Sequence, residues 1–366
     1  MIDSAERKSE SRTPRMALPQ KSAVRNASLP VTHATPADPW LVRAAAGWLQ
    51  AGHMTRLGIG NTMRIAQAYN RIRFSSRDHW RRSMYERHLD ALLQENGGLI
   101  RPAMEMTDGF VIDSSFTLPH LDRILADARE IIAERCGRRL NVDSYRSFFQ
   151  DVWTPQDYEK YSAFLDFATS SDVLAVVANY LKCIPALSTV LPPGIRFVES
   201  NAAFDQEPNR PKDSQLYHLD YHSRPNVYVI VLLRDTTPES GPFTFLPRSV
   251  SDRAVKALRY RSRSMTYRVP DEKMYSVIDR KEAIEFCYPR GTVLFIHSSG
   301  CFHYGSRNSV NPRFQLMLGY TGVCRTDFGE VLQTTQVYPV RPADSALRRV
   351  VLDNRMQPGT VTADRQ

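Results

Sequence analysis

Apolar residues follow two different periods along the chain, and the change of period divides it into two parts. From residue 40 to about residue 94, Trp, Leu, Ile and Tyr recur at steps of three and four. This spacing predicts two or three amphipathic helices with a break near 58–61. The same period predicts further helices at 118–134, 156–168 and 171–181. Pro192-Pro193-Gly194 then ends the helical part.

After residue 194 the chain consists of short segments rich in Val, Ile, Phe and Tyr that are separated by turn residues. This pattern predicts a sandwich or barrel of short strands. The candidate strands are residues 109–112, 195–200, 215–222, 226–233, 242–246, 265–269, 274–278, 292–297, 313–321 and 333–338. Helices first and strands afterwards favour an α+β fold in which helices cover the outside of a jelly-roll barrel.

Composition divides the chain into four regions. Residues 1–38 are rich in Ser, Pro, Arg and Ala without an apolar period, which is typical of a disordered terminus. Residues 39–98 form a basic helical extension, residues 104–340 the main domain, and residues 341–366 a polar C-terminal tail. The five cysteines include no CxxC pair, and no apolar run reaches the length of a membrane span. We therefore expect a cytoplasmic protein.

The net charge of +9 is concentrated in the basic helical extension. Between residues 40 and 90 there are nine arginines and three acidic residues. One interpretation is that these helices pack on the main domain with their arginines in solvent; the other is contact with a membrane surface or a protein partner. Nucleic acid is not an expected partner, because no recognised nucleic-acid module accompanies the charge.

The chemistry of the chain centres on His218 and Asp220. On a strand, residues two apart project from the same face, so this imidazole and carboxylate can reach one point. They supply two of the three ligands of the 2-His-1-carboxylate triad that binds non-haem Fe(II). His297 and His303 are both candidates for the third ligand. We favour His303 because of the arginine that follows it.

Arg313 begins a strand whose other face is apolar, so its side chain is predicted to point with Gln315 and Met317 into the barrel lumen. A guanidinium in that position needs an anion. The C5 carboxylate of 2-oxoglutarate would provide one that fits the fork of the side chain. A salt bridge to a protein carboxylate is the alternative.

Other interpretations of the same residues stay open. His218 and His222 are four apart, as in zinc-binding helices, although HLDYH lacks the glutamate of the zinc protease motif. Cys301 and His303 could also ligate zinc, but no second Cys/His pair accompanies them. A β-barrel that binds metal without catalysis is a further alternative.

The chain resembles the phytanoyl-CoA dioxygenase-like branch of the Fe(II)/2-oxoglutarate oxygenases over about residues 104–323. The matching pieces are Asp108-Gly109-Phe110, YHLDYH at 217–222, Leu233-Arg234-Asp235, Glu239-Ser240-Gly241-Pro242-Phe243, Leu246-Pro247-Arg248-Ser249 and GTVLFIHSSGCFHYGSRNSVNPR at 291–313. The family's Pro-Gly-Ser-His turn reads Pro247-Arg248-Ser249-Val250 here. The interval from His303 to Arg313 is one residue shorter than in some members.

The resemblance implies a double-stranded β-helix (jelly-roll, cupin-like) core with flanking helices. It implies Fe(II) at His218, Asp220 and His303, with 2-oxoglutarate at Arg313 and O2 as the oxidant. The expected reaction is hydroxylation, or another oxidation, of an unactivated C–H bond in a small-molecule or acyl-type substrate. The products from the cosubstrate would be succinate and CO2. Because related halogenases lack the carboxylate ligand, Asp220 argues against halogenation.

Further residues are candidates for supporting roles around this centre. Those expected to orient the metal ligands or to bind the cosubstrate are Gln215, Tyr217, Ser306 and Asn308. Arg196 or Ser200 could reach the lumen from the strand at 195–200. Arg196, Arg234 or the basic helices could select an acidic substrate, an expectation that comes from charge alone.

Overall fold

A computed structural model describes residues 39–51, 57–140, 148–190, 193–205, 210–260, 267–333 and 337–356. The predicted disordered segment 1–38 and the end of the predicted tail lie outside these residues.

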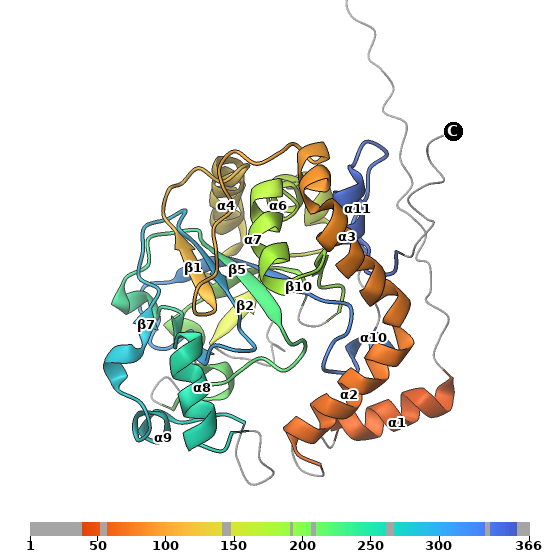
Figure 1. Ribbon diagram of the computed structural model, residues 1–366. Coiled ribbons are helices and arrows are strands. Elements are labelled where there is room, and N and C mark those ends of the chain that lie inside the picture. The colour runs from red at the N-terminus through yellow and green to blue at the C-terminus, as the bar shows by residue number, and fades with distance from the viewer. Residues whose placement is uncertain are drawn as a thin grey trace, which may run out of the picture. The chain divides into compact units, whose positions relative to one another are not determined.

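Two antiparallel sheets form the centre of the main domain (Figure 1). The strands of the large sheet, in spatial order, are β1 (Phe110–Asp113), β8 (Val293–Ile296), β5 (Asn226–Leu232), β10 (Arg313–Thr321), β4 (Ile195–Ser200) and β2 (Phe149–Asp151), with β3 (Ala186–Leu187) also paired to β10. The small sheet has the order β7 (Ile284–Glu285), β6 (Thr244–Phe245) and β9 (His303–Tyr304). Neighbours distant in sequence, such as β1 and β8, pair side by side, which gives a jelly roll its crossing connections.

Alternation along β10 gives the large sheet two different faces. Phe314, Leu316, Leu318 and Tyr320 belong to the core beneath the helices, whereas Met317 packs in a second cluster with side chains of the small sheet. The prediction for 313–321 is therefore correct in its bounds and in its faces. The second cluster unites Phe243 and Phe245 with residues of β5 and β8. The two sheets thus close around a shared interior.

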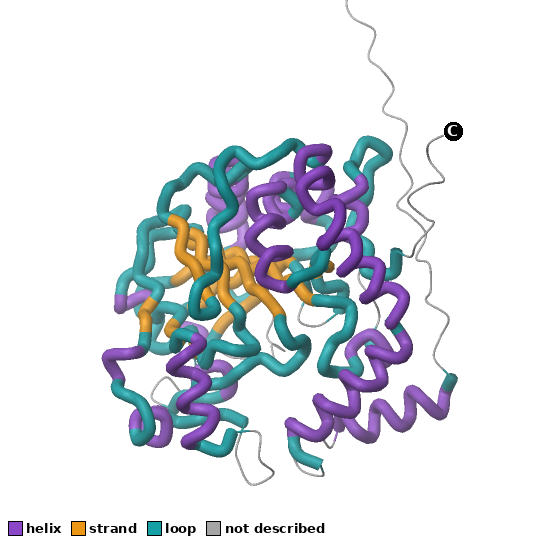
Figure 2. The backbone as a smooth tube through the Cα atoms, viewed as in Figure 1, coloured by secondary structure: helices purple, strands orange, loops and turns teal. Residues whose placement is uncertain are grey.

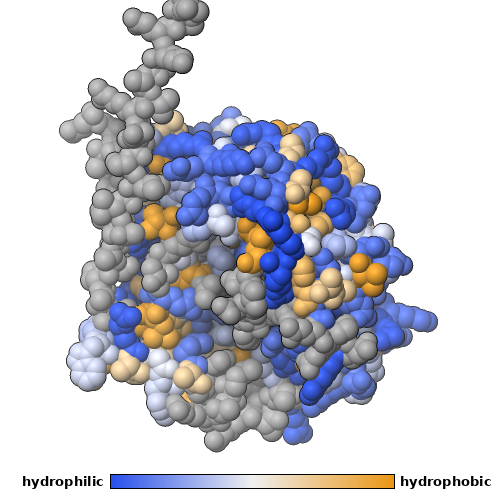
Figure 3. Space-filling view, turned by 180° about the vertical axis from the view of Figure 1, so that it is seen from behind, coloured by the Kyte–Doolittle hydropathy of each residue, from blue (hydrophilic) through white to orange (hydrophobic). Residues whose placement is uncertain are grey.

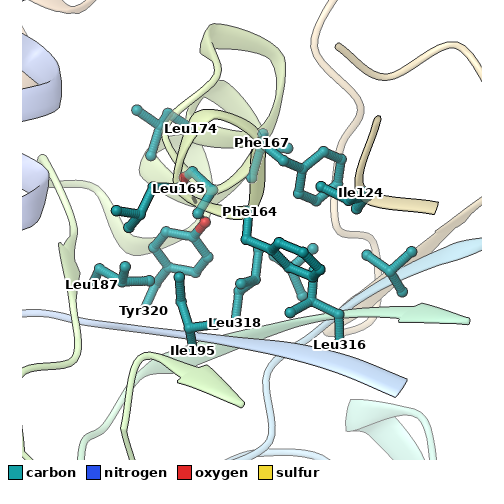
Figure 4. Close-up of a cluster of buried hydrophobic side chains, with 14 of the residues drawn as sticks. Ile124, Phe164, Leu165, Phe167, Leu174, Leu187, Ile195, Leu316, Leu318 and Tyr320 are labelled. Carbon is teal, nitrogen blue, oxygen red and sulfur yellow. Dashed lines mark hydrogen bonds between the residues drawn. The ribbon is translucent and has the colours of Figure 1, made fainter. Parts of the chain in front are cut away.

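Helices cover the outer face of the large sheet (Figures 1 and 2). The helices of the described residues are α1 (Trp40–Ala51), α2 (Ile59–Arg73), α3 (Ser75–Glu95), α4 (Leu121–Arg135), α5 (Asp157–Lys160), α6 (Ala163–Ala168), α7 (Ser171–Leu181), α8 (Arg248–Ala257), α9 (Asp271–Tyr275), α10 (Gly329–Leu332) and α11 (Ala346–Leu352). Among them, α8 and α9 lie away from this layer and pack in a separate buried cluster with Tyr217. Phe164 and Phe167 of α6 lie over Leu316 and Leu318 of β10 (Figure 4). Each of these buried side chains contributes roughly 1.5–3 kcal/mol of apolar burial, so this layer fixes the sheet that carries the site.

The basic helices are attached to the rest of the fold by buried polar side chains. Asn70 of α2 donates hydrogen bonds of 2.9 Å to the backbone carbonyls of Arg325 and Asp327. Arg81 of α3, which is 1% exposed, donates to the carbonyls of Pro185 and Val350. α2 and α3 therefore pack on the main domain, but Arg77 and Arg81 are buried in that contact rather than in solvent as predicted.

The outer face of α1 is apolar. Trp40, Leu41 and Trp48 are 74%, 61% and 55% exposed, while Ala46 on the opposite side is buried. Seen from behind, the surface is mostly hydrophilic with separate hydrophobic areas (Figure 3). Within the described part of the chain, no helix combines the length and apolar character needed to cross a bilayer.

Several predicted elements are wrong in type or extent. Residues 215–222 do not form a continuous strand: Asp213–Gln215 is a 3-10 helix, and only Tyr217 and His218 make isolated bridges. The predicted strand 274–278 overlaps helix α9, since Pro270 and the acidic residues after it favour a helix start. The predicted helix 156–168 is divided into α5 and α6.

Other elements had no counterpart in the prediction, or could not be compared in full. The elements without a counterpart are β2, β3, β7, β9, α8, α10 and α11, the last of which lies in the predicted polar tail. Residues 265–266 and 334–336 fall outside the described residues. Residues 333, 337 and 338, the parts of the predicted strand 333–338 that are described, do not belong to a sheet.

Candidate active site

His218, Asp220 and His303 come together inside the barrel. One potential ligand atom from each lies within 4.8 Å of the others. His218 and His303 form an isolated antiparallel bridge, in which each backbone N–H donates to the carbonyl of the other residue with an N···O distance of 3.0 Å. Their ring centroids are 4.4 Å apart. Each imidazole Nε2 lies 3.8 Å from a different oxygen of Asp220.

Hydrogen bonds fix which nitrogen of each imidazole points into the site. Nδ1 of His218 lies 2.9 Å from the carbonyl oxygen of Leu216, and Nδ1 of His303 lies 3.0 Å from that of Cys301. A carbonyl oxygen can only accept, so both Nδ1 atoms carry the proton and both Nε2 atoms offer a lone pair. This is the tautomer that a metal ligand requires.

The carboxylate ligand is held by Ser298, which follows the strand β8. The Ser298 hydroxyl donates to Oδ2 of Asp220 over 2.6 Å, and its carbonyl accepts the Asp220 backbone N–H over 3.0 Å. Asn226 at the start of β5 receives the N–H of Ser299 over 2.9 Å and keeps this turn in place. Asp220 therefore has a defined orientation although it does not lie in a strand.

Burial and charge act together on His303. Burial lowers the pKa of its imidazole below the ordinary value, the Asp220 carboxylate opposes this change, and the Arg268 guanidinium adds to it. The Phe243 ring stacks on the imidazole at 5.2 Å between centroids. His303 is consequently neutral, and free to act as a ligand, at lower pH than an exposed histidine.

Arg313 lies at the start of β10 and is 4% exposed. Its guanidinium donates to the Gly241 carbonyl and, over 2.9 and 3.2 Å, to the hydroxyls of Ser306 and Ser200, while Nε has no hydrogen-bond partner. Burial lowers its pKa to about 9. No carboxylate of the described residues forms an ion pair with it, so the predicted alternative of a protein salt bridge is not observed. The buried guanidinium, with its Nε unsatisfied, is therefore a candidate site for an anionic ligand.

Of the other predicted site residues, Gln215 and Asn308 lie near Arg313 and Ser306, whereas the Tyr217 side chain points away from the site. Gln215 is buried and donates to the Ser306 carbonyl over 2.9 Å, so it supports the same corner. Asn308 lines a small hollow together with Ser306. Tyr217 does not reach the metal ligands: its hydroxyl meets that of Tyr275 at 3.0 Å, and its ring packs against Tyr304.

The arginines proposed for substrate selection are occupied elsewhere. Arg196 forms an ion pair of 3.1 Å with Asp151. The Arg234 guanidinium lies 4.5 Å from the ring centroid of Phe314, on the helix-covered face of the sheet. Arg234 therefore lies on the helix-covered face, whereas Arg196 is paired with Met317 and shares the lumen face of the sheet, as predicted.

The rival ligands lie apart from the triad. Nδ1 of His297 is 2.7 Å from the hydroxyl of Tyr180, and its Nε2 is 2.9 Å from that of Ser299. Nδ1 of His222 lies 2.8 Å from Oδ2 of Asp327. The spacing that suggested a zinc helix therefore does not bring His218 and His222 to one ion. Cys301 is buried in the apolar interior, which raises the pKa of its thiol to about 12.

The donor set fits the metal that the sequence pattern implies. Two imidazoles and one carboxylate, crowded on one side of a point, are typical of non-haem Fe(II) oxygenases and leave coordination positions open. Gly305 lies between Arg313 and Phe243: a Cβ atom added to this glycine would be 3.4 Å from Nη2 of Arg313 and 3.6 Å from the Phe243 ring. Since that ring stacks on His303, the arginine and the triad belong to one interior site.

Comparison with known families gives the same answer. The family model "Phytanoyl-CoA dioxygenase (PhyH)" matches residues 106–312, more than half of the chain. The chain belongs to the phytanoyl-CoA dioxygenase family. It is therefore a 2-oxoglutarate-dependent oxygenase, an iron enzyme, and its barrel is a double-stranded β-helix of the cupin-like type. The family match ends one residue before Arg313 and does not include the basic helices.

Solved structures with detectable similarity are distant. EctD from S. alaskensis, solved with 2-oxoglutarate and 5-hydroxyectoine, is 16% identical over 69% of this chain and 81% of its own, with a TM-score of 0.40. The non-haem α-ketoglutarate-dependent epimerase SnoN from nogalamycin biosynthesis is 15% identical over 64% and 82%, with a TM-score of 0.36. HygX from Streptomyces hygroscopicus, with nickel and 2-oxoglutarate, is 16% identical over 58% and 82%, with a TM-score of 0.31. No curated protein matches the sequence.

Two residues near the triad were missed in the sequence. Ser298 was not among the predicted site residues, although its place just after the predicted strand 292–297 was a signal for a role at the barrel mouth. Arg268 lay in a segment interpreted only as a strand, without attention to which face its charge would occupy.

Proposed function

We propose that this oxygenase hydroxylates, or otherwise oxidises, an unactivated C–H bond in a small-molecule or acyl-type substrate. His218, Asp220 and His303 would hold Fe(II), and Arg313 would bind the C5 carboxylate of 2-oxoglutarate, with succinate and CO2 as the products of the cosubstrate. The observation that carries this proposal is the ligand triad within 4.8 Å, with an unpaired buried guanidinium in the same interior.

Bound iron, with 2-oxoglutarate and O2, would supply the oxidising power, and the chain's own residues do the rest. The two Nδ1–H groups donate to backbone carbonyls and so hold both imidazoles in the ligating tautomer. Ser298 orients the Asp220 carboxylate. Phe243 and the apolar lumen around it exclude water from the reacting atoms. The carboxylate in the triad occupies the place a halide would need, which favours oxidation over halogenation.

Arg313 would fix the direction of the cosubstrate. Ser200 and Ser306 accept hydrogen bonds from one side of the guanidinium, and Gln215 holds the Ser306 backbone, so the side chain is oriented before any ligand arrives. The unsatisfied Nε then gives an incoming carboxylate a donor that has no competing protein partner. Preorganisation of this kind lowers the entropic cost of binding.

The proposal is tested by anaerobic titration of the full-length protein with Fe(II) and 2-oxoglutarate. We expect a weak visible charge-transfer band that His218→Ala abolishes. His222→Ala is the matched control, because it removes a nearby imidazole that lies on Asp327 rather than on the metal. A band that survives His218→Ala unchanged would contradict the ligand assignment. Formation of succinate in a substrate screen then identifies the oxidised compound.

A further inference from the structure

Arg268 occupies the position opposite His218 on the side away from His303. Tyr217 and Val269 form an antiparallel bridge with N···O distances of 3.1 and 2.9 Å in the two directions. In that register the next pair is His218 with Arg268, while His218 is also paired with His303 on its other side. Facing residues of antiparallel strands project from the same face. The row His303, His218, Arg268 therefore brings a cation next to the two metal-binding imidazoles.

The guanidinium of Arg268 lacks a compensating anion. Its Nη1 is buried and has no hydrogen-bond partner. The group lies 4.9 Å from the ring centroid of Tyr267, whose ring in turn lies 6.2 Å from that of His218. Among the described residues, no carboxylate forms an ion pair with Arg268 within 4.0 Å.

The charges of the proposed function do not use this cation. Fe(II) and Arg313 together are balanced by Asp220 and the two carboxylates of 2-oxoglutarate. The cosubstrate would also extend in the other direction: Gly305 and Phe243, which connect the triad to Arg313, lie on the side of His303. Arg268 lies beyond His218. One positive charge therefore remains beside the metal ligands, on the side left for the substrate.

We propose that Arg268 binds an anionic group, a carboxylate or a phosphate, of the substrate and so positions the substrate against the metal centre. This inference rests on the proposed function above and adds the chemical class of the substrate to it. A guanidinium offers such an oxyanion two parallel donors and a fixed orientation. The oxidised C–H bond would then lie near the charged end of the substrate, because Arg268 faces the proposed metal ligand His218 in the register of the isolated Tyr217–Val269 bridge.

The test uses the metal-free, full-length protein, so it does not depend on iron chemistry. Thermal unfolding is followed during titration with inorganic phosphate and, separately, with acetate, in the wild type, Arg268→Gln and the control Arg234→Gln. We expect saturable stabilisation of the wild type by one of the two anions, which identifies a phosphate or a carboxylate as the preferred group. Arg268→Gln should weaken this response at least about tenfold, the loss expected when a charged hydrogen-bonding partner is removed. Arg234→Gln should leave it unchanged.

Two further readouts separate substrate binding from other roles. Without anions, Arg268→Gln should unfold at the same temperature as the wild type or higher, because it removes a cation without a partner. In the iron-loaded protein it should leave 2-oxoglutarate affinity within about twofold of the wild type, well under the tenfold effect of a lost charged contact.

Three results would overturn the assignment: an anion response that is missing in the wild type, or that persists in Arg268→Gln and also in the double variant Arg268→Gln/Arg313→Met, which lacks both unpaired guanidinium groups; a lower unfolding temperature; or weaker 2-oxoglutarate binding. Failure of the iron band in the wild type would instead overturn the proposed function. The anion titration would still decide whether Arg268 binds an oxyanion.

Discussion

Replacing Ser298 with alanine should weaken metal binding while leaving the fold intact. The Ser298 hydroxyl is the side-chain donor that holds Asp220 Oδ2, over 2.6 Å, and Ser298 itself is 1% exposed. Without it, the carboxylate can rotate away from the point where His218 and His303 meet. Asn226, the other neighbour of this hydroxyl, still receives the Ser299 N–H over 2.9 Å, so the local turn is retained.

The size of the effect follows from the surroundings of the carboxylate. A hydrogen bond to a charged group contributes about 1.5–3 kcal/mol, and loss of a group that orients a metal ligand costs about 10- to 100-fold in affinity. The Asp220 side chain is 17% exposed, so water can partly replace the hydroxyl. We therefore expect the lower end of this range of affinity loss, that is, a dissociation constant for Fe(II) about tenfold larger, which corresponds to about 1.4 kcal/mol.

The assay is anaerobic titration of Fe(II) into the full-length protein at saturating 2-oxoglutarate, followed through the visible band or by calorimetry. Ser299→Ala is the matched control, since this neighbouring hydroxyl is equally buried but lies on His297 rather than on Asp220. Thermal unfolding of the metal-free variants shows whether either change damages the fold. Equal Fe(II) affinities for Ser298→Ala and the wild type, or an equal loss in Ser299→Ala, would refute the orienting role.

Three further outcomes are expected. Arg313→Met should raise the dissociation constant of 2-oxoglutarate at least about tenfold, while metal binding without cosubstrate, measured by calorimetry, stays the same; a loss of metal affinity would argue against separate roles. In the metal-free protein, burial keeps the pKa of His303 below 6.5, so the unfolded state binds the proton more readily and stability should decline as the pH falls below that value. His303→Gln should lack this part of the pH dependence in chemical denaturation, and an unchanged profile would contradict it. Finally, Trp40→Ala with Trp48→Ala should reduce sedimentation of the protein with anionic liposomes if the apolar face of α1 contacts lipid; equal sedimentation would leave these helices with a packing role alone.

His218, Asp220 and His303, which the sequence singled out, do converge, although the strand predicted to carry the first two does not form. His218 and Asp220 were placed on one face of a strand at 215–222, yet this segment is largely irregular. The two side chains still converge, because the His218 backbone is hydrogen-bonded to that of His303 and the Asp220 N–H donates to the Ser298 carbonyl. Local spacing could reveal the pair, but the partners that orient it come from positions about eighty residues away, such as the 78 residues between Asp220 and Ser298. Contacts of this range have no local signature.

The two strands that were predicted with correct bounds share a simple cause. Turn-forming residues bound both strands, Gly194 and Asn201 around β4 and Pro312 and Gly322 around β10, and in β10 apolar residues also alternate from Phe314 to Tyr320. Short strands such as β6 and β9 contain two residues each and depend on each other for pairing. Their positions follow from closure of the barrel, which a single segment does not encode. The cytoplasmic location stays a prediction.

The position of Arg81 has a practical consequence for anyone who wishes to shorten this enzyme. Its guanidinium donates to the carbonyls of Ile184, Pro185, Val350 and Asp353, at distances of 2.6–3.3 Å. A fragment trimmed to residues 106–312 would lose Arg81 together with Val350 and Asp353, and with them the hydrogen bonds that join both ends of the chain to the Ile184–Pro185 backbone. The boundaries of the family match are therefore unsuitable ends for a stable fragment, because the amino-terminal helices hold the carboxyl-terminal segment against the sheet.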